Sequence, residues 1–202
     1  AAAAEAAAAR AEEQLLEQAL ERARQESLAE AARRREQLER LEARLACPWN
    51  LAINPRTDDT GNCQFDSAAD QLRKHDGLGD VTHADVRAAA VRWLRANAAH
   101  RISDDAANDD TLESWVRATQ GLEWSAYCDK MAGDKVWGDE ITLKAITEVY
   151  GARAFLWSST VSERHYFSEH VPTTFDAHRP RTLLLGHVLE VHYVSVHLRA
   201  NG

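Results

Sequence analysis

The first 46 residues constrain the fold of this chain most, because they contain no glycine, no proline and no aromatic residue. Ala, Glu, Gln, Arg and Leu fill nearly all of this stretch, and these residues are strong helix formers. Pro48 cannot continue a helix, so we expect one long helix that ends before it. The sequence therefore predicts two units, a helical extension over residues 1–46 and a globular domain over residues 47–202.

Composition limits the partners of the globular part. The chain has 202 residues, of which 45% are hydrophobic and 28% charged, which is enough for one good core. Its formal net charge is −8, and no basic stripe interleaved with aromatic residues is present. We therefore expect no nucleic-acid partner and no anionic membrane surface. No segment approaches the apolar length of a membrane span, so we expect no membrane insertion, and the acidic balance suits a basic partner.

Cysteine usage predicts the compartment. Cys47, Cys63 and Cys128 form neither a metal-spaced pair nor an even set for disulfides. This pattern suits a reducing compartment. We expect a cytoplasmic protein, with the nucleus or delivery into a host cytosol as alternatives, and we expect neither a metal nor an organic cofactor.

A single cysteine follows a Gly-Asn turn and begins a helical pattern. Gly61 and Asn62 tolerate a tight turn, and apolar residues recur at helical spacing over residues 65–72. Cys63 thus lies at a helix N-terminus, where the helix dipole favours a thiolate. The N–H groups of the turn around Gly61 and Asn62 could stabilise an oxyanion. The pattern predicts a nucleophile, whereas a buried cysteine before an ordinary helix is the alternative interpretation.

A histidine lies in an alternating apolar stretch at the other end of the chain. Residues 183–198, LLLGHVLEVHYVSVHL, predict two strands or one bent strand. On a strand His192, Val194 and Val196 share one face, so the imidazole would project from a rigid element. A cysteine and a histidine far apart in sequence are the expected pair of a thiol enzyme, with His192 as general base. The alternative is a strand histidine bonded to a backbone carbonyl.

The residues between these two segments predict the fold class. Thr82 and Asp139 each begin a helix, and Gly151 ends the second one. Trp115 lies in a further helical pattern that we expect to pack, and residues 152–157 indicate a buried strand. Helices come first and strands mostly later, which predicts an α+β fold with a small central sheet flanked by helices.

Three segments together resemble a known family. GNCQF followed by ADQL, WGDEITLKA at residues 137–145, and EVHYVSV at residues 190–196 resemble the ovarian tumour (OTU) deubiquitinases. The resemblance implies a papain-like fold and, as substrate and partner, ubiquitin or a ubiquitin-like modifier, including polyubiquitin chains. It also implies hydrolysis of the isopeptide bond at the C-terminal glycine of that modifier.

Two positions depart from the pattern of this family. The usual motif is Asp-Gly-Asn-Cys, whereas here Thr60 separates Asp59 from the glycine. Many members carry Asn or Asp two residues after the histidine to orient the imidazole, and here that position is Val194. We therefore expect Asp59 to complete a triad with Cys63 and His192, and Asp58 is the alternative acid. Both aspartates could instead be ordinary turn residues.

These departures leave more than one function open. The intact GNC and EVHY segments favour a thiol deubiquitinase. The displaced aspartate and the apolar Val194 favour a catalytically weak or inactive module of the same fold that binds ubiquitin or a ubiquitin-like protein. Acyl transfer directed at glutamine is a third use of the same cysteine and histidine.

The long helix carries a pattern of its own. Leu16, Ala19, Leu20 and Ala23 follow an acidic pair and resemble a ubiquitin-interacting motif, although its usual serine is missing. This predicts a partner contact through the helix over residues 12–45, with a solvated spacer or a self-association helix as alternatives. Nearer the domain, apolar residues form a short seam at helical spacing: Leu38, Leu41 and Leu45.

Overall fold

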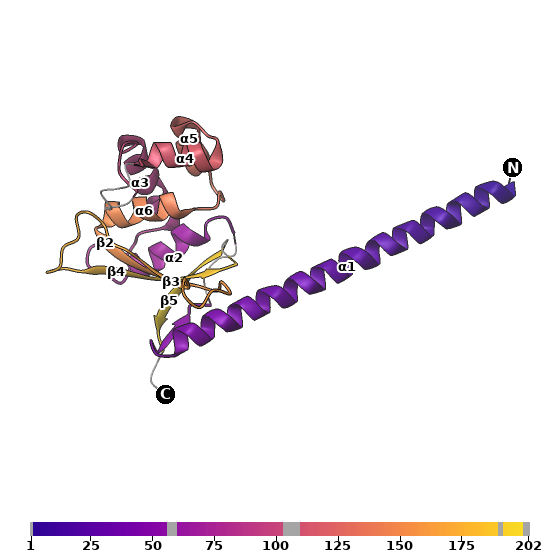
Figure 1. The fold of residues 1–202 in the computed structure, drawn as a ribbon, viewed down its shortest axis with the longest axis horizontal. Helices are drawn as coiled ribbons and strands as arrows, with labels where there is room; N and C mark the ends of the chain where they lie inside the picture. Colours follow the sequence, from indigo (N-terminus) through magenta and orange to yellow (C-terminus); the bar gives the residue numbers. More distant parts are fainter. Residues whose placement is uncertain (1, 56–59, 103–109, 190–191, 200–202) are drawn as a thin grey trace.

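The computed structural model describes residues 2–55, 60–102, 110–189 and 192–199. One long helix, α1 (Ala2–Ala46), projects from the folded part of the molecule and ends before Pro48, as predicted (Figure 1). The other helices are α2 (Cys63–Leu72), α3 (His83–Ala96), α4 (Leu112–Gln120), α5 (Trp124–Met131) and α6 (Glu140–Tyr150). The strands are β1 (Leu51–Ile53), β2 (Ala152–Ser158), β3 (Phe167–His170), β4 (Arg181–Val188) and β5 (His192–Leu198). The predicted α+β fold with a long N-terminal helix is confirmed.

The strands form one mixed sheet in the order β1-β5-β4-β2-β3. Strands β2 and β4 are parallel, and the other neighbours are antiparallel. The C-terminal apolar stretch therefore forms two strands, β4 and β5, and not one bent strand. In their register Val188 lies opposite His192, so the predicted base begins its strand directly beside the end of β4.

The main core lies on one face of the sheet, under α2 and α6, with α3, α4 and α5 stacked farther out (Figure 1). Alternation along the strands sends every second side chain into it. Strand β4 contributes Leu183 and Leu185, and β5 contributes Tyr193. Helix α2 packs across β4 and β5, which places its first residue, Cys63, at this face of the sheet.

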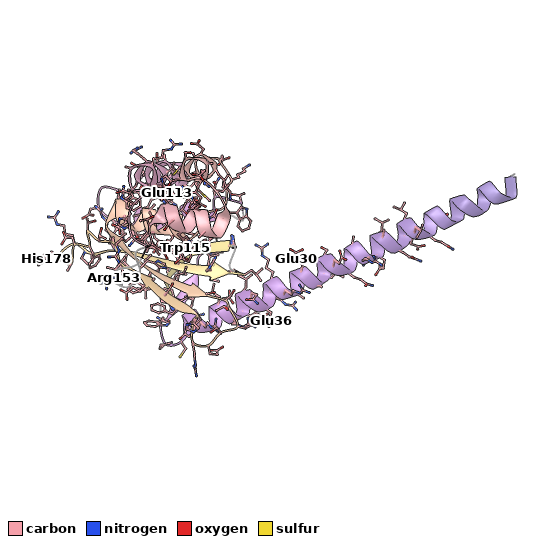
Figure 2. The ribbon with its side chains drawn as sticks, turned by 45° about the horizontal axis from the view of Figure 1, so that its top comes forward. Glu30, Glu36, Glu113, Trp115, Arg153 and His178 are labelled. Atoms are coloured by element: carbon pink, nitrogen blue, oxygen red, sulfur yellow. The ribbon has the colours of Figure 1, made fainter. Side chains whose placement is uncertain are left out.

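The last turns of α1 cover the opposite face. Leu41 and Leu45 are fully buried and belong to a second cluster with Val194, Val196 and other residues of the sheet. The predicted apolar seam is thus a packing surface, and packing crosses the expected boundary after residue 46. Farther out, residues 13–36 are exposed; Figure 2 labels Glu30 and Glu36 on α1. None of the helices in the described ranges, α1 included, combines the length and apolar character needed to cross a membrane.

Local signals set most helix ends as predicted. Asp139 accepts a hydrogen bond from the backbone N–H of Thr142 at the start of α6, and Gly151 ends that helix in a left-handed conformation with φ 56°. Helix α4 differs from expectation at one residue. The helix packs as predicted through Leu112 and Val116, which are fully buried, but Trp115 does not join them and is 36% exposed.

Candidate active site

Cys63 and the start of β5 meet at one point in the fold. Cys63 is the first residue of α2, and its side chain is buried. The backbone N–H of Tyr193 donates to Cys63 Sγ over 3.4 Å. His192 directly precedes Tyr193 and is the first residue of β5, also largely buried. Two residues 129 positions apart in the sequence are thus brought to neighbouring places by the packing of α2 on the sheet.

The turn before the cysteine fits closely against the loop that precedes α6. Gly61 touches the backbone of Lys135, and a Cβ at position 61 would overlap the Lys135 carbonyl, so only glycine fits there. The buried Asn62 side chain donates to Asp134 Oδ1 (2.8 Å) and accepts from the backbone N–H of Lys135 (3.0 Å). These contacts fix the conformation in which the chain enters α2.

The predicted oxyanion donors are used within the turn in this structure. The backbone N–H of Cys63 donates to the Thr60 carbonyl over 3.0 Å. The N–H of Asn62 donates to Thr60 Oγ1 over 3.3 Å. Stabilisation of an oxyanion by these two groups therefore requires the turn to change its hydrogen bonds when substrate binds.

Arg87 holds this turn from α3, and sequence reasoning missed it. The buried guanidinium donates to Asn62 Oδ1 (2.6 Å) and Gly61 O (3.2 Å), and to Val136 O (2.8 Å) in the facing loop. It also lies over the Phe65 ring, 3.9 Å from the centroid. An arginine within an amphipathic helix is usually exposed, so no local signal marked this one.

Electrostatic effects on Arg87 connect it to the candidate nucleophile. Burial lowers the pKa of Arg87, while the charges of Asp134 and Cys63 act in the opposite direction. The interaction is reciprocal, so a guanidinium that is stabilised by an anionic sulfur also favours that anion. Together with the N-terminus of α2, Arg87 gives the sulfur a positive electrostatic environment.

The proposed orienting residues differ in what the structure says of them. Asp58 and Asp59 lie outside the described residues, so their assignment stays a prediction. Val194 is buried against Leu41 of α1, in an apolar environment that offers the imidazole no acceptor from that side chain. The departure from the family pattern at this position therefore coincides with the contact between α1 and the sheet.

A cavity of about 390 Å³ adjoins the candidate site on the α6 side of the sheet. Tyr193 lines it, stacked on His187 with ring centroids 4.4 Å apart, and burial raises the pKa of the Tyr193 hydroxyl. Asp139 and Glu140 give its rim a negative charge. Such a cavity could accept an extended, basic chain segment. Among the residues that the structure describes, no three His, Cys, Asp or Glu side chains are grouped to hold a metal ion.

Comparison with known families identifies one match. The family described as "OTU-like cysteine protease" matches residues 58–192, which is more than half of the chain. Two proteins of Arabidopsis thaliana, named ovarian tumor domain-containing deubiquitinating enzymes 10 and 9, are 28% identical over 138 residues and 29% identical over 145 residues. These matches cover 68% and 72% of this chain but 32% and 35% of the relatives, so the chain spans about a third of their length.

Solved structures resemble the fold. The OTU domain of OTUD1 superimposes with a TM-score of 0.56 at 15% identity, over 83% of this chain and 99% of that one. An OTU deubiquitinase from Wolbachia pipientis wMel, solved bound to ubiquitin, superimposes with a TM-score of 0.51 at 14% identity. That match covers 75% of this chain and 98% of the bacterial one. At these identities the likeness concerns the fold alone.

Proposed function

We propose that this chain, which belongs to the family of OTU-like cysteine proteases, is a thiol-dependent deubiquitinase. It would hydrolyse the isopeptide bond at the C-terminal glycine of ubiquitin or a ubiquitin-like modifier. The observation that carries the proposal is the buried Cys63 at the N-terminus of α2, with its sulfur 3.4 Å from the backbone nitrogen of Tyr193, the residue after His192. A nucleophile and its base must lie close together in the fold, and here they come from distant parts of the sequence.

The proposed reaction uses the chain's own residues. His192 takes the proton of Cys63, and the thiolate attacks the carbonyl carbon of the terminal glycine. The tetrahedral intermediate collapses when His192 protonates the leaving lysine amine and the C–N bond breaks. Water, deprotonated by His192, then cleaves the thioester and releases the modifier's carboxylate and the thiol. Asp59, or alternatively Asp58, would orient the imidazole and stabilise its charged form.

The cavity beside Tyr193 supports a basic substrate tail. We propose that the C-terminal tail of the modifier, which carries arginine in ubiquitin, lies near Asp139 and Glu140 on its way to Cys63.

The three cysteines are all thiols, and Cys47 is exposed, which supports a reducing compartment such as the cytoplasm.

The projecting helix supports a second contact with a polyubiquitin chain. Leu16 and Leu20 are 62% and 63% exposed, four residues apart, with Ala19 beside them. We propose that this face of α1 binds a second ubiquitin unit. Leu20→Asp should slow cleavage of polyubiquitin several-fold and leave cleavage of a monoubiquitin substrate unchanged, whereas Leu28→Asp, equally exposed on the same helix, should change neither. Equal rates of polyubiquitin cleavage for Leu20→Asp and the parent would contradict the proposed contact.

Reaction with a ubiquitin that carries an electrophilic C-terminal warhead tests the proposed activity. Intact mass should report one adduct on the parent chain and none on Cys63→Ala. Cys47→Ala is the matched control, because it removes an exposed thiol that a nonspecific electrophile would reach first. It should retain the adduct in full.

A noncatalytic module of the same fold remains the second candidate. The apolar Val194 and the displaced Asp59 favour it. In that case the parent chain would form no adduct with the warhead, and calorimetry would still measure binding of ubiquitin by both the parent and Cys63→Ala.

A further inference from the structure

The end of α1 lies outside the residues that match the family, yet it holds the segment that follows β2. Arg44 Nη1 donates to the carbonyls of Ser158 and Thr160, each over 2.7 Å. Arg40 Nη1 donates to the carbonyl of Ser159 over 3.1 Å. The Arg44 side chain is 9% exposed and that of Arg40 is 23% exposed, so these three bonds are largely shielded from water.

Ser159 connects these arginine contacts to His187, near the end of β4, and to Leu189, which follows β4. Ser159 is fully buried, and its backbone N–H donates to the carbonyl of His187 over 2.9 Å. Its hydroxyl oxygen accepts the backbone N–H of Leu189 over 2.9 Å. Leu189 has a left-handed backbone, with φ 57°, and lies three positions before His192 in the turn between β4 and β5. Leu189 is not a glycine, and its Cβ disfavours a left-handed backbone, so this conformation needs support from neighbouring residues.

A third side chain of α1 reaches the same serine. The Gln37 amide satisfies its hydrogen bonds when its nitrogen faces Ser159, where it lies 2.6 Å from Ser159 O and 2.9 Å from Ser159 Oγ. In that orientation its oxygen accepts from Arg40 Nη1 over 3.3 Å. In that orientation Gln37 contacts the carbonyl oxygen and the hydroxyl of Ser159, and Arg40 contacts the carbonyl oxygen.

Apolar packing supports the same hairpin from below. Val194 and Val196 follow His192 on β5, and they pack in one cluster with Leu41 and Leu45. Gly186 on β4 leaves room for this approach, because a Cβ there would lie 2.8 Å from Leu41 Cδ2. Figure 1 shows this end of α1 against the sheet.

We propose that residues 37–45 of α1 are a positioning element for the catalytic histidine. They hold Leu189, which follows β4, through Ser159, and they hold the start of β5 through the apolar cluster, and so fix the place of His192 relative to Cys63. The proposal rests on the proposed role of His192 as base. A displacement of about 1 Å between reacting groups can cost about a hundredfold in rate, so loss of one support should be measurable.

Arg40→Ala, with Arg35→Ala as matched control, tests the contact from the helix. Both substitutions remove an i,i+4 ion pair with a glutamate on α1, Glu36 for Arg40 and Glu39 for Arg35, but only Arg40 bonds to Ser159. On a fluorogenic monoubiquitin amide, Arg40→Ala should lower kcat about tenfold and leave KM within about twofold. Arg35→Ala should match the parent in both.

Ser159→Ala tests the contact at the turn. Thr147→Ala is its control, since it also removes a buried hydroxyl, one that donates within α6 to Lys144 O. Ser159→Ala should lower kcat, shift the pH profile of Cys63 alkylation by iodoacetamide toward that of His192→Ala, and speed hydrogen exchange at the Leu189 amide. Ser159→Thr keeps the oxygen and should restore all three readouts, while Thr147→Ala should change none of them.

The outcomes separate this proposal from the proposed activity. His192→Ala with the turnover of the parent would overturn both. An inactive His192→Ala together with parent kcat and alkylation profile in Arg40→Ala and Ser159→Ala would overturn the positioning role alone. Reduced kcat in both variants, with Arg35→Ala and Thr147→Ala unchanged, would support it. Thermal unfolding of every variant identifies loss of fold, and an equal kcat loss in a destabilised control would also count against the role.

Discussion

At the scale of single residues, the turn before Cys63 depends on the fork of Arg87. Its guanidinium reaches Gly61 O, Asn62 Oδ1 and Val136 O at once and stacks on Phe65. These three bonds come from Nη2, and Nη1 of the same guanidinium donates to Met131 O over 3.0 Å. A lysine ammonium has a single nitrogen and cannot reach all four acceptors together. Arg87→Lys should therefore lower the free energy of unfolding by about 2–3 kcal/mol, the cost of buried acceptors that lose their donors. Denaturant titration measures it.

The same substitution should also slow alkylation of Cys63, because the turn that carries the sulfur loses its support. Arg95→Lys is the control, since Arg95 is exposed on the same helix and pairs with Asp129. It should change stability by less than about 0.5 kcal/mol. Parent-like stability in Arg87→Lys would mean that the network around Asn62 holds the turn without it.

Val194 tests whether the usual amide of the family would serve this chain. Val194→Asn buries an amide against Leu41 with no polar partner at that contact, so we expect a loss of about 1–3 kcal/mol in stability and no gain in kcat. Val171→Asn, at an exposed position, is the control for the amide itself. A rise in kcat for Val194→Asn would show that the amide can reach the imidazole despite the packing of α1.

At the scale of elements, Glu148 fixes the segment after β3 to α6. Burial alone would raise the pKa of Glu148, but hydrogen bonds from Thr173 and the charge of Lys144 outweigh it, and the net pKa is lowered. His100 also faces this carboxylate, 3.6 Å away. A carboxyl with a lowered folded-state pKa contributes stability above its unfolded pKa, about 4.3, and loses it as pH falls through the folded value.

Glu148→Gln should consequently be less stable than the parent at pH 7, by about 1–3 kcal/mol, with the difference shrinking below about pH 4.3. Urea unfolding between pH 7 and pH 3 measures both curves. Glu163→Gln is the control, because its exposed carboxylate should leave the shape of the curve unchanged. Parallel curves for Glu148→Gln and the parent would exclude Glu148 as a source of the acid sensitivity.

Many helix and strand positions could be predicted from local sequence, whereas contacts between residues distant in sequence could not. Asp139 begins α6 and Gly151 ends it, as the sequence predicts, because caps act within a few residues. The GNC turn marked Cys63 in the same way. The roles of Arg87 and Ser159 could not be predicted from the sequence. An arginine in a helix and a serine in a polar loop acquire such roles only through hydrogen bonds to backbone groups that are distant in sequence. The sequence therefore predicts Cys63 and His192, whose chemical roles stay predictions, but not the residues that support them.

At the scale of the whole molecule, α1 divides into a part that projects and a part that packs. Residues 13–36 are exposed, whereas Leu41 and Leu45 are fully buried beneath the sheet. Loss of one buried leucine typically costs about 2–5 kcal/mol, and a whole domain holds only about 5–15 kcal/mol. The position of a cut within one continuous helix should therefore decide whether the rest of the molecule folds.

Two N-terminal deletions locate that division. Removal of residues 2–33 should leave the midpoint of thermal unfolding within a few degrees of the parent, because the described side chains that it removes, those of residues 13–33, are exposed. Removal of residues 2–46 also removes Leu41, Leu45, Arg40 and Arg44, and should yield a chain without cooperative unfolding, as followed by circular dichroism. If the shorter chain unfolds cooperatively at the parent temperature, the domain over residues 47–202 is independent of α1, and the sequence-based boundary holds. If it does not, the end of α1 is a part of the folded domain, and its packing against β5 is the reason.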